Sequence, residues 1–195
     1  MKSEDNYIEE LLRRGFKVFN PYMLLLWRLG LGTWMSFWPE GFGRYMVITH
    51  TGRKTGMRRQ TPVNYSVVEG EVYCTAGFGP ISDWYRNMMK NPKVEVWLPD
   101  GWWEGTAEEV IDPAARLPLM RQVILESGFA GRLAGLDVRR MNDEEFDHAT
   151  AGYRLIHLRR TAPRTGPGGP GDLAWVWPLA TFILLPLAFR KRKCR

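Results

Sequence analysis

Apolar and polar residues alternate along the middle of the chain with the period of two that is typical of β-strands. Turn signals, Glu69-Gly70 and Pro99-Asp100-Gly101, separate some of these runs. The alternating runs are 44–50, 58–68, 71–77, 93–98, 102–111 and 153–160. About six strands, mainly antiparallel, with helices between and beside them, predict an α+β fold built on a small β-barrel.

Helix signals occur before and between the predicted strands. Asn20 and Pro21 resemble an N-cap and a first helical position in front of the apolar stretch YMLLLWRLGLGTWMSFW. Ser82 is expected to cap a short helix, and Asn142 with Glu145 has the spacing of a capping box. The helix after Asn20 is predicted to lie under the barrel core or to touch lipid.

The C-terminal part of the chain has a different composition. The sequence TAPRTGPGGPGD, residues 161–172, is rich in Gly and Pro and predicts a flexible tether that does not pack. Residues 173–189 carry no charge, and RKRKCR follows them. A straight helix of about 17 residues would be about 25 Å long, shorter than a hydrocarbon core of about 30 Å, and Pro178 and Pro186 disfavour it further.

We therefore expect residues 173–195 to dip into one leaflet or lie in the membrane interface, with the basic tail on anionic headgroups. The alternative is an apolar C-terminal helix of the core. The N-terminus is acidic and has no apolar signal segment, so the expected location is the cytoplasmic face of the cell membrane. The expected parts are an N-terminal helical segment, the barrel, a linker and a membrane segment, at residues 1–43, 44–160, 161–172 and 173–195.

Charge and cysteine content exclude several classes of function. The net charge is +6, but five cations lie among the last six residues, and the rest of the chain carries 22 basic and 21 acidic residues. A nearly neutral body argues against nucleic-acid binding. Cys74 and Cys194 fit neither a disulfide framework nor a metal site, and the three histidines are scattered. We predict no metal site.

One short stretch, THTGRKTGMRRQTP, concentrates positive charge between the first two predicted strands. Four cations, Arg53, Lys54, Arg58 and Arg59, lie in seven positions around two glycines. Glycines permit close approach of an anion, and Arg and Lys donate charge-assisted hydrogen bonds, so a phosphate group fits this loop. The spacing is neither a Walker A loop nor a Rossmann fingerprint. A solvated hairpin tip is the alternative interpretation.

The order of several motifs resembles a known family. TGRKTG is followed by Arg59 and Pro62, then by 76–79, then by DWYRN and NPKVEV. This series resembles the deazaflavin-dependent nitroreductase and quinone reductase family over roughly 20–160. The resemblance implies a split β-barrel fold. It also implies a coenzyme, reduced 8-hydroxy-5-deazaflavin (coenzyme F-420), that passes its hydride to a quinone or a nitro compound.

The same resemblance implies the residues that would bind the coenzyme. Arg53, Lys54 and Arg59 would bind its phosphate, and the segment from Ala76 to Gly79 would border its ring with Trp84 and Asn87. Phe78 departs from the pattern, because some relatives carry a lysine there. The full set of predicted site residues is Gly52, Arg53, Lys54, Thr55, Arg59, Pro62, Ala76, Gly77, Phe78, Gly79, Trp84 and Asn87.

The residues leave other functions open. Hydride transfer requires no protein nucleophile, and the sequence identifies no catalytic residue. An FMN-dependent oxidoreductase of the wider split-barrel group is one alternative, because FMN also carries a phosphate. A non-enzymatic lipid- or fatty-acid-binding protein of the same fold is another. A quinone-like acceptor, membrane lipid and a second copy of the chain in a homodimer are the expected partners.

Overall fold

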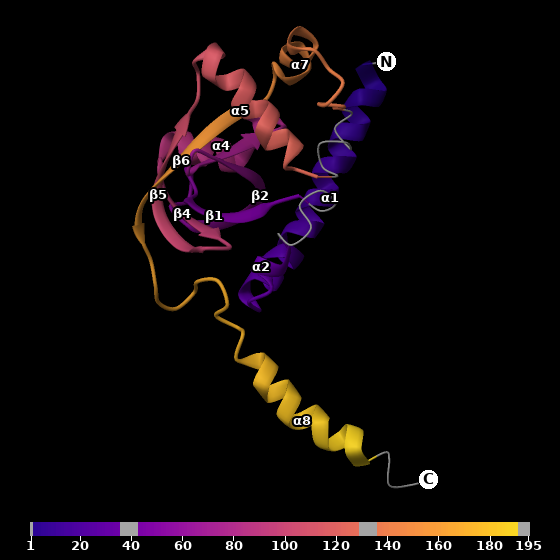
Figure 1. Cartoon of the computed structure of the whole chain (residues 1–195), viewed down its shortest axis with the longest axis vertical. Coiled ribbons are helices and arrows are strands. Elements are labelled where there is room, and N and C mark those ends of the chain that lie inside the picture. The colour runs from indigo at the N-terminus through magenta and orange to yellow at the C-terminus, as the bar shows by residue number, and fades with distance from the viewer. Residues whose placement is uncertain (1, 36–42, 129–135, 191–195) are drawn as a thin grey trace.

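Six antiparallel strands form a closed barrel in the computed structural model, which describes residues 2–35, 43–128 and 136–190. Their order around the barrel is β1-β2-β3-β6-β5-β4, with β4 pairing back onto β1 (Figure 1). The strands are β1 Tyr45–Thr51, β2 Arg58–Val68, β3 Glu71–Ala76, β4 Lys93–Leu98, β5 Gly101–Glu109 and β6 Arg154–Pro163. The predicted α+β barrel with flanking helices is confirmed.

Alternation places one set of side chains inside the barrel and the other against helices. Met46 and Ile48 of β1 belong to the interior cluster, whereas Val47 points outward and packs under a helix. The β2–β3 turn at Glu69-Gly70 has positive φ angles at both residues, 53° and 83°, which is the conformation that a two-residue hairpin requires. The sequence signals for these strands and this turn are therefore confirmed.

Helices lie around the barrel, except for the last one, which extends away from it (Figure 1). They are α1 Lys2–Arg28, α2 Gly32–Met35, α4 Asp83–Lys90, α5 Pro113–Leu125, α7 Asp143–Thr150 and α8 Val176–Arg190, with a short 3-10 helix, η1 Gly79–Ile81. The predicted capping box of Asn142 and Glu145 is present at the start of α7. Ser82 occupies the N-cap position of α4, but its hydroxyl makes no capping hydrogen bond.

The expected helix start at Asn20 and Pro21 is wrong. Helix α1 begins at Lys2 and continues through Pro21 to Arg28. Pro21 lacks the amide hydrogen that would bond one turn back, so it removes one helical hydrogen bond. The upstream sequence, rich in Glu, Leu and Arg, has high helix propensity and extends the helix across this position.

The C-terminal half of α1 attaches to the barrel through tryptophans. Trp27 packs with Val47, Trp97 and Trp102 on the outer face of β1, β4 and β5, and the rings of Trp27 and Trp97 have centroids 6.4 Å apart. Figure 1 shows α1 running along the outside of the barrel. This apolar contact fixes the helix on the side of the sheet that faces away from the interior.

The prediction of a flexible, unpacked tether is wrong. Residues 161–163 belong to β6, and the segment that follows is hydrogen-bonded to the end of α1. The amides of Gly171 and Leu173 donate to the carbonyls of Trp27 and Arg28 at 3.0 and 2.8 Å. Glycine-rich sequence packs here because glycine has no side chain: a Cβ on Gly169 would collide with the indole of Trp102.

An ion pair strengthens the same junction. The guanidinium of Arg28 donates to Asp172 through Nε, at 3.0 Å to Oδ1, and through Nη2, at 2.9 Å to Oδ2. The indole Nε1 of Trp177 donates to the carbonyl of Leu29 at 2.8 Å. These contacts cap the C-terminus of α1, and we call them the α1–α8 bracket. No helix within the described residues is both long enough and apolar enough to cross a membrane.

Two tryptophans close together in sequence should respond very differently to truncation. Trp27 is 2% exposed, so Trp27→Ala should lower the free energy of unfolding by about 3 to 5 kcal/mol. Trp34 is 75% exposed, so Trp34→Ala should change it by less than about 0.5 kcal/mol. Urea denaturation of both variants measures the difference, and equal effects would contradict the packing of α1 on the barrel.

Candidate functional site

The cationic loop is a tight connection between β1 and β2. The amide of Gly52 donates to the carbonyl of Met57, and the amide of Gly56 donates to the carbonyl of Gly52, both at 2.8 Å. Gly56 has a φ of +67°, which favours glycine. A Cβ on Gly52 would lie 2.9 Å from Nε of Arg59 and 3.0 Å from Oγ1 of Thr55. The missing side chain therefore lets these donors lie against the loop backbone.

Arg53 fastens the loop to helix α4. Its Nη2 donates to Oδ1 of Asp83 at 2.8 Å, and its Nη1 donates to Oδ1 of Asn87 at 2.9 Å. The backbone amide of Arg53 donates to the same Asn87 oxygen at 3.1 Å. The hydrogen bond from Arg53 also lowers the pKa of Asp83, against the smaller opposing effect of burial. Most of the hydrogen-bonding capacity of Arg53 is thus used inside the protein.

Asn87 continues this connection into the barrel. Its Nδ2 lies 3.3 Å from Nδ1 of His50 on β1, and Nε2 of His50 lies 3.1 Å from Oγ1 of Thr61 on β2. His50 is 3% exposed. Burial, and to a smaller extent the positive charge of Arg59, lowers its pKa to about 4. A neutral imidazole therefore joins the loop, α4 and two strands in one hydrogen-bonded chain.

The four cations of the loop fall into two pairs. Arg53 is bound as described, and Arg58 forms an ion pair with Glu95 of β4 at 2.6 Å. Glu95 also accepts from Arg164 at 2.9 Å, so its carboxylate is shared between two arginines. Lys54 and Arg59 are exposed, and within the described part of the chain neither forms an ion pair. These two side chains are available to an anion from outside the protein.

The second predicted group of site residues follows β3 and leads into α4. Ala76 is buried at the end of β3, and Gly77 and Phe78 connect it to η1. Gly79 has a φ of +57°, and a Cβ there would collide with the carbonyl oxygen of Gly152. The backbone at 79 therefore lies directly against the turn before β6, where only glycine fits.

The structure brings some of the predicted site residues together and separates others. Asn87 contacts Arg53 directly, so the loop and α4 form one site. Trp84 is partly buried and packs against the barrel interior, and Pro62 is buried in β2 opposite Val47. Pro62 therefore shares the outer face of the sheet with Val47, whereas Trp84 packs between α4 and the barrel interior.

Three contributors were not among the predicted site residues. They are Asp83, His50 and Thr61, which complete the hydrogen-bonded chain. Asp83 and Asn87 are four residues apart on α4 and therefore share one helix face. That spacing beside a cationic loop is the signal in the sequence that could have identified Asp83.

A second polar contact joins helix α4 to the barrel. The hydroxyl of Tyr85 donates to Oε2 of Glu109 at 2.6 Å, and Arg154 lies 3.7 Å from the same carboxylate. Burial, followed by the hydrogen bond to Glu109, raises the pKa of Tyr85 to about 12. The hydroxyl thus stays protonated at neutral pH and anchors α4 to β5.

Fold and loop together define a class of protein: a small antiparallel barrel with a cationic hairpin loop held by a neighbouring helix. Residues 37–132 match the model of the family described as F-420H(2)-dependent quinone reductase. The family resemblance seen in the sequence is thus confirmed, and residues 37–132 are similar to that family. The match gives no support to the FMN alternative.

Solved structures also resemble the chain. A conserved hypothetical protein from Mycobacterium tuberculosis is 18% identical, with 64% of this chain and 84% of that chain covered and a TM-score of 0.46. A structure described as an F-420-dependent reductase is 19% identical, with 59% of this chain and 93% of that chain covered and a TM-score of 0.44. At TM-scores below 0.5 these similarities give no information about function. The family match is therefore the comparison that bears on it.

His50 should make stability depend on pH. Its pKa is about 4 in the folded protein and 6.5 in an ordinary setting, so the unfolded chain binds more protons between these values. The stability that neutral His50 contributes is therefore complete above pH 6.5 and falls as the pH drops toward 4, by about 2 to 3 kcal/mol.

Denaturation of the parent chain and of His50→Gln across this pH range measures the effect. The variant should show a flatter profile between pH 4 and 6.5 than the parent. His148→Gln removes an exposed histidine and serves as the matched control, with a profile like that of the parent. A parent profile that is equally flat would show that His50 titrates normally.

Proposed function

We propose that this protein is an oxidoreductase that uses a reduced deazaflavin coenzyme to reduce a quinone or nitro-type acceptor at the cytoplasmic face of the membrane. The observation that carries the proposal is the pair of available cations, Lys54 and Arg59, on a glycine-framed loop that Arg53 holds in place. This loop lies inside the segment that matches the quinone reductase family.

The residues present fit the phosphate of such a coenzyme. Neither Lys54 nor Arg59 forms an ion pair among the described residues, and Gly52 leaves room beside Arg59 Nε and Thr55 Oγ1. Charge-assisted hydrogen bonds of this kind are short and strong. When bound, the reduced deazaflavin would supply the hydride, and the protein would hold the coenzyme in position.

Arg53 acts on this site without binding the anion itself. Because its guanidinium is bonded to Asp83 and Asn87, it sets the loop conformation in which Lys54 and Arg59 project outward. The site is therefore organised before the coenzyme arrives, which lowers the entropic cost of binding. The segment from Ala76 to Gly79 leads into the same helix and is the proposed border of the coenzyme ring.

A lipid-soluble quinone is the acceptor we favour. The family name specifies a quinone reductase. The exposed apolar helix α8, followed in the sequence by a basic tail, favours a position at the membrane, where such quinones dissolve. Nitroaromatic compounds are the second class of acceptor to test.

Removal of single charges from the loop should distinguish the two available cations, Lys54 and Arg59, from the paired cation Arg58. Lys54→Ala and Arg59→Ala should each weaken coenzyme binding by roughly 10- to 150-fold, because one charged hydrogen bond contributes about 1.5 to 3 kcal/mol. Arg58→Ala is the matched control, because Arg58 is paired with Glu95, and it should change affinity by less than about threefold. Titration by isothermal calorimetry measures all three.

The assignment is contradicted if Lys54→Ala and Arg59→Ala bind the coenzyme as tightly as the parent. Equal weakening by all three variants would indicate long-range charge attraction instead of a specific site. In that case the affinity of every variant should fall steeply and similarly with added salt.

The reaction is tested directly with the purified full chain. Reduced deazaflavin should be oxidised in the presence of menadione, and the loss of its absorbance follows the reaction. FMN in place of deazaflavin should neither bind tightly nor support turnover. Turnover of nitroaromatics without turnover of quinones would replace the quinone assignment, and binding of fatty acid without either coenzyme would replace the enzyme assignment.

A further inference from the structure

Helix α8 exposes apolar side chains around its whole circumference. Eight of them are between 48% and 80% exposed: Trp177, Leu179, Phe182, Ile183, Leu184, Leu185, Leu187 and Phe189. At about 100° per residue these positions point in all directions from the helix axis. Figure 1 shows α8 extending away from the rest of the molecule, in yellow.

This distribution favours lipid over another protein chain. Pairing with a second copy of α8 would need one apolar stripe and a polar remainder, whereas a helix that is apolar on all sides requires an apolar solvent. The charges that follow also fit lipid: Arg190, Lys191, Arg192, Lys193 and Arg195 would meet anionic headgroups.

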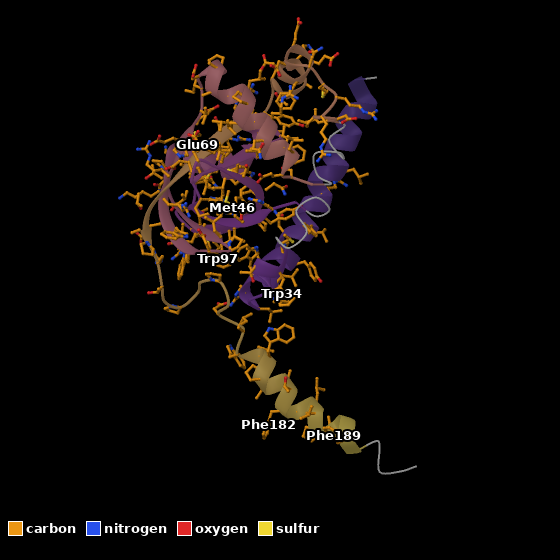
Figure 2. All side chains as sticks on the ribbon, viewed as in Figure 1. Trp34, Met46, Glu69, Trp97, Phe182 and Phe189 are labelled. Atoms are coloured by element: carbon orange, nitrogen blue, oxygen red, sulfur yellow. The ribbon has the colours of Figure 1, made fainter. Side chains whose placement is uncertain are left out.

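Exposed tryptophans surround the point where α8 leaves the body. Trp34 of α2 is 75% exposed and Trp175 is 60% exposed, and Trp177 is the second residue of α8. Figure 2 shows Trp34 at the end of the body from which α8 extends. Tryptophan concentrates at the boundary between headgroups and hydrocarbon, because its ring is apolar and its N–H is polar.

The α1–α8 bracket joins this surface to the body through several contacts. Arg28 and Asp172 form a forked ion pair, and three further hydrogen bonds join residues 171–177 to the end of α1. Helix α1 in turn is fixed to the barrel by Trp27. Insertion of α8 therefore sets the orientation of the barrel, which a flexible tether would leave free.

We propose that α8 and the three tryptophans Trp34, Trp175 and Trp177 form one surface that binds an anionic lipid bilayer, and that the Arg28–Asp172 ion pair holds the barrel in a fixed orientation on it. Helix α8 has 15 residues, which corresponds to about 22 Å at 1.5 Å per residue. A helix of this length that lies along the interface keeps both of its ends, the tryptophans and the basic tail, at the headgroups. The inference rests on the membrane position proposed above and is independent of the coenzyme.

Lipid binding is tested by sedimentation of the full chain with vesicles of phosphatidylcholine and phosphatidylglycerol. The parent should sediment with them, and the double variant Phe182→Asp with Leu185→Asp should stay in solution, because each charge opposes insertion. Trp34→Ala should weaken vesicle affinity by roughly tenfold. Ile111→Ala, which removes a side chain of similar exposure (78%) elsewhere, should leave it unchanged.

Each opposite result overturns the proposal. Equal affinity of Trp34→Ala and Ile111→Ala would exclude the tryptophan surface. A different contrary result is that the parent fails to bind vesicles and forms a dimer without lipid, while the double variant stays a monomer. That result would assign α8 to contact with a second copy of the chain. These measurements use no coenzyme, so their failure is separate from a failure of the proposed reductase activity.

The fixed orientation is tested through Trp34. Lipids brominated near the headgroup should quench its fluorescence, measured as the difference between the parent and Trp34→Phe. Asp172→Lys places a cation beside Arg28, so this quenching should fall by at least half while the chain still sediments with vesicles. Adding Arg28→Glu exchanges the two charges and should restore it. Quenching that is the same in all three backgrounds would show that the bracket does not set the orientation.

Discussion

The amide oxygen of Asn87 is the point on which the arrangement of the site depends. It accepts hydrogen bonds from the backbone and from the side chain of Arg53, while the amide nitrogen of the same residue meets His50 inside the barrel. One buried side chain thereby links a surface loop to the core. Because an unpaired polar group at this depth would be costly, the loop has little freedom to adopt another conformation. The same restriction fixes the backbone from which the available cations Lys54 and Arg59 extend.

Much of the barrel followed from local patterns, and the site followed from them only in part. Alternation and turn residues such as Glu69-Gly70 gave strands and a hairpin, because both depend on neighbours in sequence. The division of the four loop cations into paired and available ones depends on Asp83 and Glu95, which are 30 and 37 residues from their partners. No local rule contains such contacts, so this division could not be predicted from the sequence.

The two errors at the ends of the chain have one physical origin. Pro21 and the glycine-rich stretch before Asp172 were interpreted by their intrinsic preferences, which favour a helix start and an unpacked coil. Tertiary contacts outweigh both preferences: Trp27 anchors α1 on the barrel, and the carbonyls at its end accept hydrogen bonds from the C-terminal segment. Propensity is a weak guide where a segment from elsewhere in the chain supplies the missing hydrogen bonds.

The order of the strands also determines when the barrel can close. Strand β6 lies between β3 and β5, and it pairs Val72 with Leu158 and Glu109 with Ile156. Until β6 is synthesised, β3 and β5 each present an open edge that other chains could pair with. The strand that closes them is followed within the next few residues by the bracket and by α8. During synthesis the strand that closes the barrel and the most apolar helix therefore leave the ribosome almost together.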